Sequence, residues 1–138
     1  MNNDGERLIL ASKRAARRAV MTDAGVPFTV QVADVDEDAL KTPGVDPVEL
    51  AVELARAKAL AVSRHDAEAW VLGADQTLAF DGGLISKAPT LAAARERLVA
   101  MRGRTHQLHS GAALARNGQV VWSGVDTVEM KMRDFSDA

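Results

Sequence analysis

The chain of 138 residues contains no cysteine. Disulfide bonds, thiolate catalysis and cysteine-ligated zinc are therefore excluded. No apolar run approaches the ~20 residues that a membrane-spanning helix needs. The first residues, MNNDGER, lack the basic start and apolar core of an export signal. These absences predict a cytoplasmic protein with no membrane partner.

The chain also lacks a large excess of charge of either sign. Its 17 Lys and Arg against 19 Asp and Glu give a formal net charge of −2. A general nucleic-acid-binding protein needs a broad basic surface, and the basic stretch KRAARR has no interleaved aromatic residues to stack on bases. We therefore expect no nucleic acid as a partner, and any anion site must be local.

Local signals predict one α/β domain with a mixed sheet, in the order β-α-β-α-β-β-α-β-β. The expected strands are residues 7–12, 28–33, 70–80 and two within 105–133, and the expected helices are residues 14–24, 46–63 and 91–101. Asp46 and Thr90 are predicted to cap helices, and Asn117-Gly118 is a typical hairpin turn. The acidic run at residues 34–38 is expected to be a loop, and both tryptophans, Trp70 and Trp122, are expected in the core.

The densest positive cluster lies between the first expected strand and the helix expected after it. Ser12 is followed by four cations, at Lys13, Arg14, Arg17 and Arg18. Cations in the first turns of a helix oppose its dipole, whereas a phosphate there would contact both the free N–H groups and the arginines. By residue type alone, a solvated helix face and a phosphate site are equally good explanations.

Asp75 is expected at the carboxyl end of the apolar strand in VLGADQT, an edge where open α/β sheets bind ligands. It could hold Mg²⁺ or accept a proton from water, or it could simply cap a turn. Glu37, in the acidic run, could face it and share a divalent metal. Lys58 interrupts an apolar helix face, which either snorkelling or function explains, and Lys87 could point toward the same edge.

The histidines are not expected to form a metal site. His106 and His109 are three residues apart on a predicted strand, and this spacing puts them on opposite faces.

Taken in order, several segments resemble the Maf family of nucleoside triphosphate pyrophosphatases. The matching pieces are LILAS with Arg17 and Arg18, GVPF, DVDE, LARAKA, GADQT, a lysine after the DGG turn, AAARERLVAMRGRTH and HSGAAL. They cover nearly the whole chain from Arg7 onward. The resemblance implies a mixed twisted sheet flanked by helices, of the Maf and ITPase-like kind.

The resemblance also implies an activity, namely hydrolysis of a nucleoside triphosphate to a monophosphate and pyrophosphate with Mg²⁺ or Mn²⁺. Asp75 falls on the catalytic acid of the family, and Glu37 would hold the metal with it. The phosphate-binding positions fall on Ser12, Arg17, Arg18, Lys58 and Lys87. These cations would neutralise the triphosphate and the leaving pyrophosphate.

Two positions bear on the choice of base. The branch that prefers dTTP and UTP usually has a threonine after the catalytic Asp and an arginine four residues after the motif serine, whereas this chain has Gln76 and Ala16 there. Gln76 resembles the branch that prefers 7-methyl-GTP, and its amide can both donate and accept hydrogen bonds.

The resemblance has departures as well. Arg14 replaces a second serine, and KAPT replaces the usual Lys-Pro at Lys87. The family continues well beyond Ala138, so we expect one domain, residues 1–138, that is incomplete at its C-terminus. This would leave a hairpin edge open to another chain, for example in a homodimer. The alternative to an enzyme is a catalytically weak nucleotide-binding or regulatory protein linked to septum formation.

Overall fold

The computed structural model describes residues 7–11, 27–42, 44–85 and 90–131. Within them, one six-stranded sheet has the order β2-β1-β3-β5-β6, and β4 pairs with β3 outside this path. The strands are β1 (Leu8–Ala11), β2 (Thr29–Val30), β3 (Trp70–Phe80), β4 (Gly83–Ile85), β5 (Thr105–Arg116) and β6 (Gln119–Lys131). The helices are α2 (Glu37–Leu40), α3 (Pro47–Ser63) and α4 (Leu91–Met101). The predicted α/β fold with a mixed sheet is confirmed.

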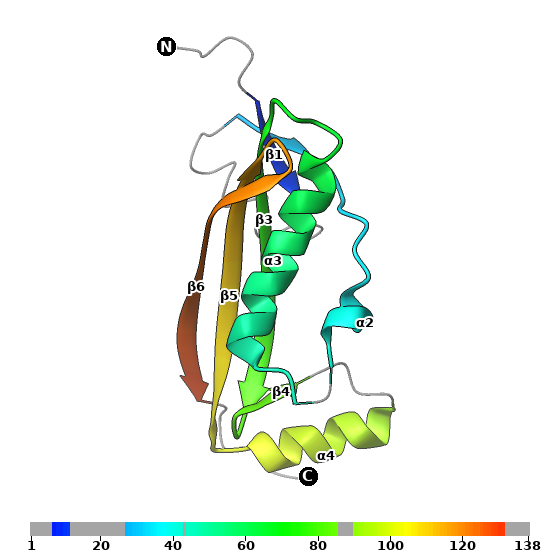
Figure 1. The fold of residues 1–138 in the computed structure, drawn as a ribbon. Helices are drawn as coiled ribbons and strands as arrows, with labels where there is room; N and C mark the ends of the chain where they lie inside the picture. The colour runs from blue at the N-terminus through cyan, green and yellow to red at the C-terminus, as the bar shows by residue number, and fades with distance from the viewer. Residues whose placement is uncertain (1–6, 12–26, 43, 86–89, 132–138) are drawn as a thin grey trace.

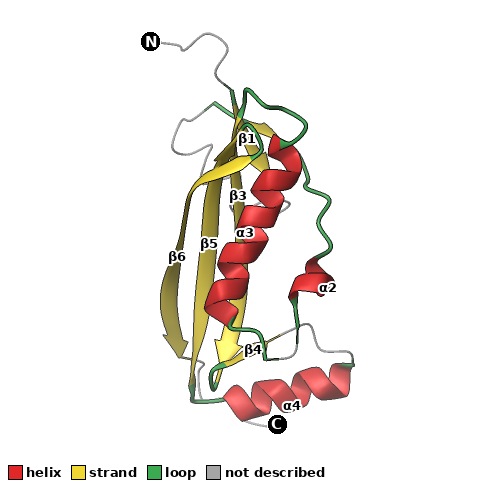
Figure 2. Cartoon of the chain, viewed as in Figure 1, coloured by secondary structure: helices red, strands yellow, loops and turns green. Residues whose placement is uncertain are grey.

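The sheet changes direction at β3. β1 runs parallel to both β2 and β3, whereas β4, β5 and β6 join by antiparallel pairing. Figure 1 shows β5 and β6 as long strands beside β3, with α3 lying along one face of them. Helix α4 crosses near the end of the sheet where β4 lies, and α2 stands beside α3 (Figure 2).

Helix α3 begins and ends where its sequence predicts. The Asp46 carboxylate accepts a hydrogen bond from the Val48 N–H at 3.1 Å, and Pro47 fills the first helical position, where no N–H is needed. At the far end, the Ser63 hydroxyl accepts a hydrogen bond from the N–H of Gly118 in the β5–β6 turn. The helix is therefore attached to the sheet at its end as well as along its face.

Small residues let α3 lie very close to the sheet. Its core-facing positions include Ala51, Ala55 and Ala59, all fully buried. A Cβ on Gly73 of β3 would collide with the backbone of Ala55, and one on Gly111 of β5 would collide with the backbone of Ala51. The helix backbone thus occupies the space of side chains on these two strands. The core between them is completed by Ile9, Val62, Ala69, Val71, Ala113 and Ala115.

The two hairpin turns have the backbone that their residues favour. Asp81 and Gly82 have positive φ, and so do Asn117 and Gly118. Two successive positive φ values match the strong twist of a tight hairpin. The predicted turns are confirmed, and so is the cap of α4, where the Thr90 hydroxyl accepts from the Ala93 N–H.

Several local predictions were wrong. The strand expected at 28–33 pairs only at Thr29–Val30, because its partner β1 is short and the chain then leaves the sheet edge. The acidic run is not all loop, since the Asp36 carboxylate accepts from the Ala39 N–H and starts α2. Trp122 is 56% exposed on the edge strand β6 instead of in the core, and Trp70 is half-buried beneath Arg116. The helix expected at 14–24 lies outside the described residues.

Candidate active site

The candidate site lies at a gap along one edge of β3. β1 accompanies β3 only from Trp70 to Gly73, where its last residue is Ala11. β4 pairs with β3 only from Leu78 onward. Among the described strands, none pairs with this edge at residues 74–77, which contain Asp75 and Gln76. The described strands therefore leave this stretch of the β3 edge unpaired.

Asp75 is 3% exposed, on the face that α3 covers. Its Oδ1 accepts a hydrogen bond from the Gln76 backbone N–H at 2.8 Å. Its Oδ2 is 3.0 Å from Nζ of Lys58, yet lies outside hydrogen-bonding alignment with any described donor. The carboxylate is therefore held by a backbone hydrogen bond at Oδ1 and by the ion pair with Lys58 at Oδ2.

The sequence had suggested that Asp75 lies at the end of its strand, and this prediction was wrong. β3 continues for five residues beyond it, to Phe80, because β5 and β4 extend the antiparallel part of the sheet. The strand that does end here is its parallel neighbour β1, at Ala11. The carboxyl end at this place in the sheet is therefore that of β1, and Asp75 lies just beyond it on β3.

Lys58 joins the two predicted carboxylates. It comes from the middle of α3 and is 7% exposed, so its ammonium does not snorkel to solvent. Its Nζ lies 3.0 Å from Asp75 Oδ2 and 4.0 Å from Oε2 of Glu37, the first residue of α2. A buried cation is costly unless it is paired, and this arrangement supplies the pairing. The structure thus brings together three charged residues that the sequence had singled out separately.

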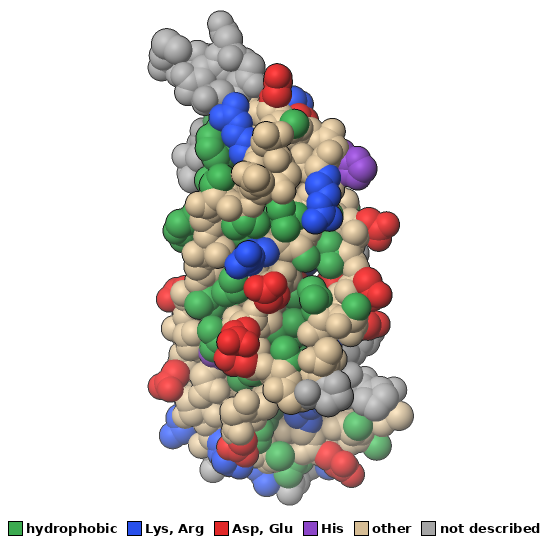
Figure 3. Space-filling view, viewed as in Figure 1, with side chains coloured by type: hydrophobic (Ala, Val, Ile, Leu, Met, Phe, Trp, Pro, Cys, Tyr) green, Lys and Arg blue, Asp and Glu red, His purple; other side chains and the backbone are tan. Residues whose placement is uncertain are grey.

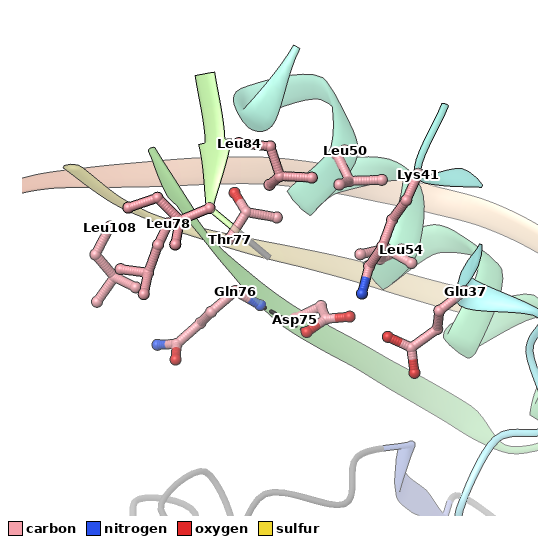
Figure 4. Close-up of a pocket in the computed structure, with 11 residues that line it drawn as sticks. Glu37, Lys41, Leu50, Leu54, Asp75, Gln76, Thr77, Leu78, Leu84 and Leu108 are labelled. Atoms are coloured by element: carbon pink, nitrogen blue, oxygen red, sulfur yellow. Dashed lines mark hydrogen bonds between the residues drawn. The ribbon is translucent and has the colours of Figure 1, made fainter. Parts of the chain in front are cut away.

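A cavity of about 300 Å³ opens beside these charges. In Figure 4, the side chains of Asp75, Glu37 and Lys41 converge on one side of β3, while Gln76 points to the other side. The described residues that line the cavity are Glu37, Lys41, Leu50, Leu54, Asp75, Gln76, Thr77, Leu78, Leu84, Ile85 and Leu108. The cavity therefore combines a charged end with an apolar end.

Gln76 faces away from Asp75 because successive residues of a strand point to opposite faces. Its Nε2 donates to Oγ of Ser110, its direct partner on β5, at 3.2 Å. The cavity contains residues from both faces, so it reaches around the open edge of β3. Asp75 and Gln76 are adjacent in sequence, and both line the cavity from opposite faces of the sheet.

Three polar residues of this region had not been singled out from the sequence. Lys41 adds a second cation to the cavity, and Thr77 is buried and donates to the Pro47 carbonyl, which attaches the start of α3 to β3. Ser110 supports Gln76. The roles of Thr77 and Ser110 follow only from the structure. Thr77 lies on the same face as Asp75 because side chains alternate along the strand, and Ser110 is the strand partner of Gln76.

Five predicted site residues lie outside the described residues: Ser12, Ala16, Arg17, Arg18 and Lys87. Their nearest described neighbours flank the gap. Ala11, directly before Ser12, ends β1 opposite Gly73, and Ile85, two residues before Lys87, pairs with Leu78.

The residues present fit a divalent metal held jointly with a substrate. Within the described residues there is no cluster of three or more His, Asp or Glu side chains that could hold a metal alone. The carboxylates of Asp75 and Glu37, however, both lie beside the ammonium of Lys58, at 3.0 and 4.0 Å. Mg²⁺ is commonly bound by one or two carboxylates together with substrate phosphates, and this pair matches that pattern.

The two histidines of β5 are separated as expected. His109 pairs in register with Thr127, whose hydroxyl is 2.8 Å from its Nδ1, whereas His106 pairs with Met130. A spacing of three along one strand places them on opposite faces.

The comparison with protein families agrees with this geometry. The Maf-like protein family model matches residues 7–138. The chain belongs to the Maf-like family. Figure 3 shows Lys and Arg as well as Asp and Glu on the face that it views. No helix among the described residues is long and apolar enough to cross a membrane.

Curated relatives of this Maf-like chain carry two kinds of name. A nucleoside triphosphate pyrophosphatase from Maricaulis maris is 46% identical over 134 residues, which cover 96% of this chain and 68% of that protein. A 7-methyl-GTP pyrophosphatase from Mesorhizobium japonicum is 44% identical over 132 residues, which cover 93% of this chain and 66% of that protein. The chain thus spans about two thirds of the length of these relatives.

Solved structures with the same fold are more distant. The Ham1 protein of Staphylococcus aureus matches with a TM-score of 0.55 at 17% identity, over 94% of this chain and 72% of that one. A HAM1 protein from Coxiella burnetii matches with a TM-score of 0.54 at 18% identity, over 90% of this chain and 70% of that one. At this identity the likeness concerns the fold, and it agrees with the mixed sheet flanked by helices.

Proposed function

We propose that this protein hydrolyses a nucleoside triphosphate to the nucleoside monophosphate and pyrophosphate. The observation that carries the proposal is the buried Lys58–Asp75 pair beside Glu37, at the open edge of β3. The names of the relatives from Maricaulis and Mesorhizobium support the same reaction. They do not favour the alternative of a regulatory protein without activity.

Asp75 is the proposed acid or base of the reaction. Asp75 lines the cavity, where its carboxylate can orient a water molecule toward the α-phosphorus and accept its proton. Lys58 would place a positive charge beside the carboxylate and the transferred group. Its burial strengthens that charge because little water screens it.

The charged end of the cavity is proposed to bind the triphosphate. Lys41 lines it, and Lys58 contacts Asp75, another residue of its lining. Ser12, Arg17, Arg18 and Lys87 remain proposed phosphate ligands from the segments that follow β1 and β4. Glu37 and Asp75 would hold Mg²⁺ or Mn²⁺, which when bound would neutralise phosphate oxygens. Phosphoryl transfer depends mainly on such positioning and charge neutralisation, so the residue types suit the reaction.

The apolar end is proposed to receive the base. Gln76 lies there, next to Leu78 and Leu108. Because several relatives are named 7-methyl-GTP pyrophosphatases, we propose 7-methyl-GTP as the first substrate to test. The expected location of the protein is the cytoplasm, where such nucleotides occur.

A direct assay tests the proposal. The purified chain is incubated with Mg²⁺ and a panel of triphosphates that includes 7-methyl-GTP, GTP and UTP, and pyrophosphate and monophosphate are measured together. We expect equal amounts of both products, and a loss of about 10²–10⁴-fold in kcat for Asp75→Asn. Asp38→Asn, an exposed carboxylate of α2, is the matched control and should retain full activity. If no triphosphate is hydrolysed, the proposed activity fails, and binding without hydrolysis would support the regulatory alternative.

A further inference from the structure

On the side of the sheet away from α3, one polar row crosses three strands. Gln76, Ser110 and Asp126 are direct partners on β3, β5 and β6. Residues paired in register point to the same face, so their side chains lie side by side. The row forms a line of hydrogen-bonding groups leading away from the open edge of β3.

The rows on either side of it are apolar. One consists of Ala74, Ala112 and Gly124, and the other of Leu78, Leu108 and Val128. Burying polar groups within an apolar surface lowers stability unless they are satisfied, and the partly buried Gln76 and Ser110 satisfy each other here. This row is therefore a candidate for recognition of a ligand.

We infer that Ser110 is a positioning residue that sets which base the site accepts, by fixing the amide of Gln76. This inference rests on the proposed function and names a determinant of its specificity. Ser110 is not among the described residues that line the cavity, whereas Gln76 is. Ser110 therefore acts through Gln76 and not by touching the substrate.

The direction of the hydrogen bond decides what Gln76 can offer. Its Nε2 donates to Ser110 Oγ, so the carbonyl oxygen Oε1 is left as the acceptor that the side chain can offer. Without Ser110 the amide can turn over and present donor or acceptor equally. Asp126, at the end of the row, is exposed and adds only acceptors when ionised.

A Gln76 amide held as an acceptor fits a base with neighbouring donors on one edge. The guanine edge, in 7-methylguanine as well, carries an N–H and an amino group side by side. Uracil offers one N–H between two carbonyl groups, which the acceptors repel. The row therefore favours guanine-type bases, including 7-methylguanine, over pyrimidines.

The test compares Ser110→Ala with the unmodified chain in two assays. In the first, kcat/KM is measured for 7-methyl-GTP and for UTP. We expect the preference for 7-methyl-GTP to fall about tenfold in Ser110→Ala, through KM, with kcat unchanged. Ser110→Thr keeps a hydroxyl and should retain the preference. Ser123→Ala, on the neighbouring strand but on the opposite face, is the matched control and should change nothing.

The second assay separates this inference from the proposed reaction. Binding of the same two triphosphates is measured by calorimetry in the Asp75→Asn background, where they are not turned over. A preference for 7-methyl-GTP that Ser110→Ala removes supports the inference, even if the unmodified chain proves inactive. An unchanged preference in Ser110→Ala overturns it while leaving the proposed reaction intact. Absence of any preference in the unmodified chain also overturns it.

Discussion

The ammonium of Lys58 lies 3.0 Å from Oδ2 of Asp75, and both side chains are almost completely buried. One group comes from the middle of α3 and the other from the middle of β3, 17 residues apart in sequence. Their contact depends on how closely the helix lies on the sheet. Glu37 is the second anionic neighbour of the same lysine, at 4.0 Å.

Removing the lysine should cost more stability than removing both charges. Lys58→Met leaves the Asp75 carboxylate buried without a counter-charge, and we expect a loss of about 3–5 kcal/mol in the free energy of unfolding. The double variant Lys58→Met, Asp75→Asn has neither charge, so it should recover a substantial part of the lost free energy of unfolding. Urea denaturation of the two single variants and the double variant measures the coupling. Additive losses would contradict a direct interaction.

The close approach of α3 at Gly111 should be essential. A Cβ at this position would meet the Ala51 carbonyl, so Gly111→Ala must displace the helix, and we expect a loss of roughly 1–3 kcal/mol. Because Gly111 is the register partner of Asp75, the displacement also moves Lys58 away from its partner. Thermal unfolding measures the loss. Gly83→Ala, where an added Cβ meets only one atom at 3.7 Å, is the matched control and should unfold at nearly the original temperature.

The far end of α3 should depend on one hydroxyl. Ser63 is fully buried, and its Oγ accepts from the Gly118 N–H at 2.9 Å. Ser63→Ala leaves that N–H without its partner, which should lower the free energy of unfolding by about 1–3 kcal/mol. Ser123→Ala removes a hydroxyl from the adjoining strand β6 and serves for comparison. Equal effects of the two substitutions would show that the hydrogen bond to Gly118 makes no specific contribution to the free energy of unfolding.

Glu37 should set the requirement for a divalent cation. Glu37→Gln keeps the shape of the side chain and removes its charge, so we expect the Mg²⁺ concentration for half-maximal activity to rise roughly tenfold. Calorimetric titration with Mn²⁺ in the presence of a non-hydrolysable triphosphate should show the same change without turnover. Asp38→Asn, on the same helix but exposed, should alter neither value. A Glu37→Gln variant with unchanged metal affinity would remove Glu37 from the proposed site.

The sequence by itself determined the elements whose signals are local. Asp46 and Pro47 define the start of α3 because the cap and the proline act on the adjoining turn of backbone alone. Asp81-Gly82 and Asn117-Gly118 define the hairpins because few other residues adopt positive φ easily. The ordered motifs also identified the family, since a long ordered match rarely arises by chance.

Only the tertiary structure decided which of the singled-out residues meet. In the sequence, Lys58 on an apolar helix face is compatible with snorkelling, and its burial depends on Gly73 and Gly111 allowing α3 to approach two distant strands. Asp75 lies in mid-strand because β5 pairs with β3 beyond it. The residues of a strand do not by themselves determine which strands pair with it. Ser110 became visible only through its register with Gln76. Long-range pairing combines segments far apart in the chain, so local patterns predict the elements while packing determines the site.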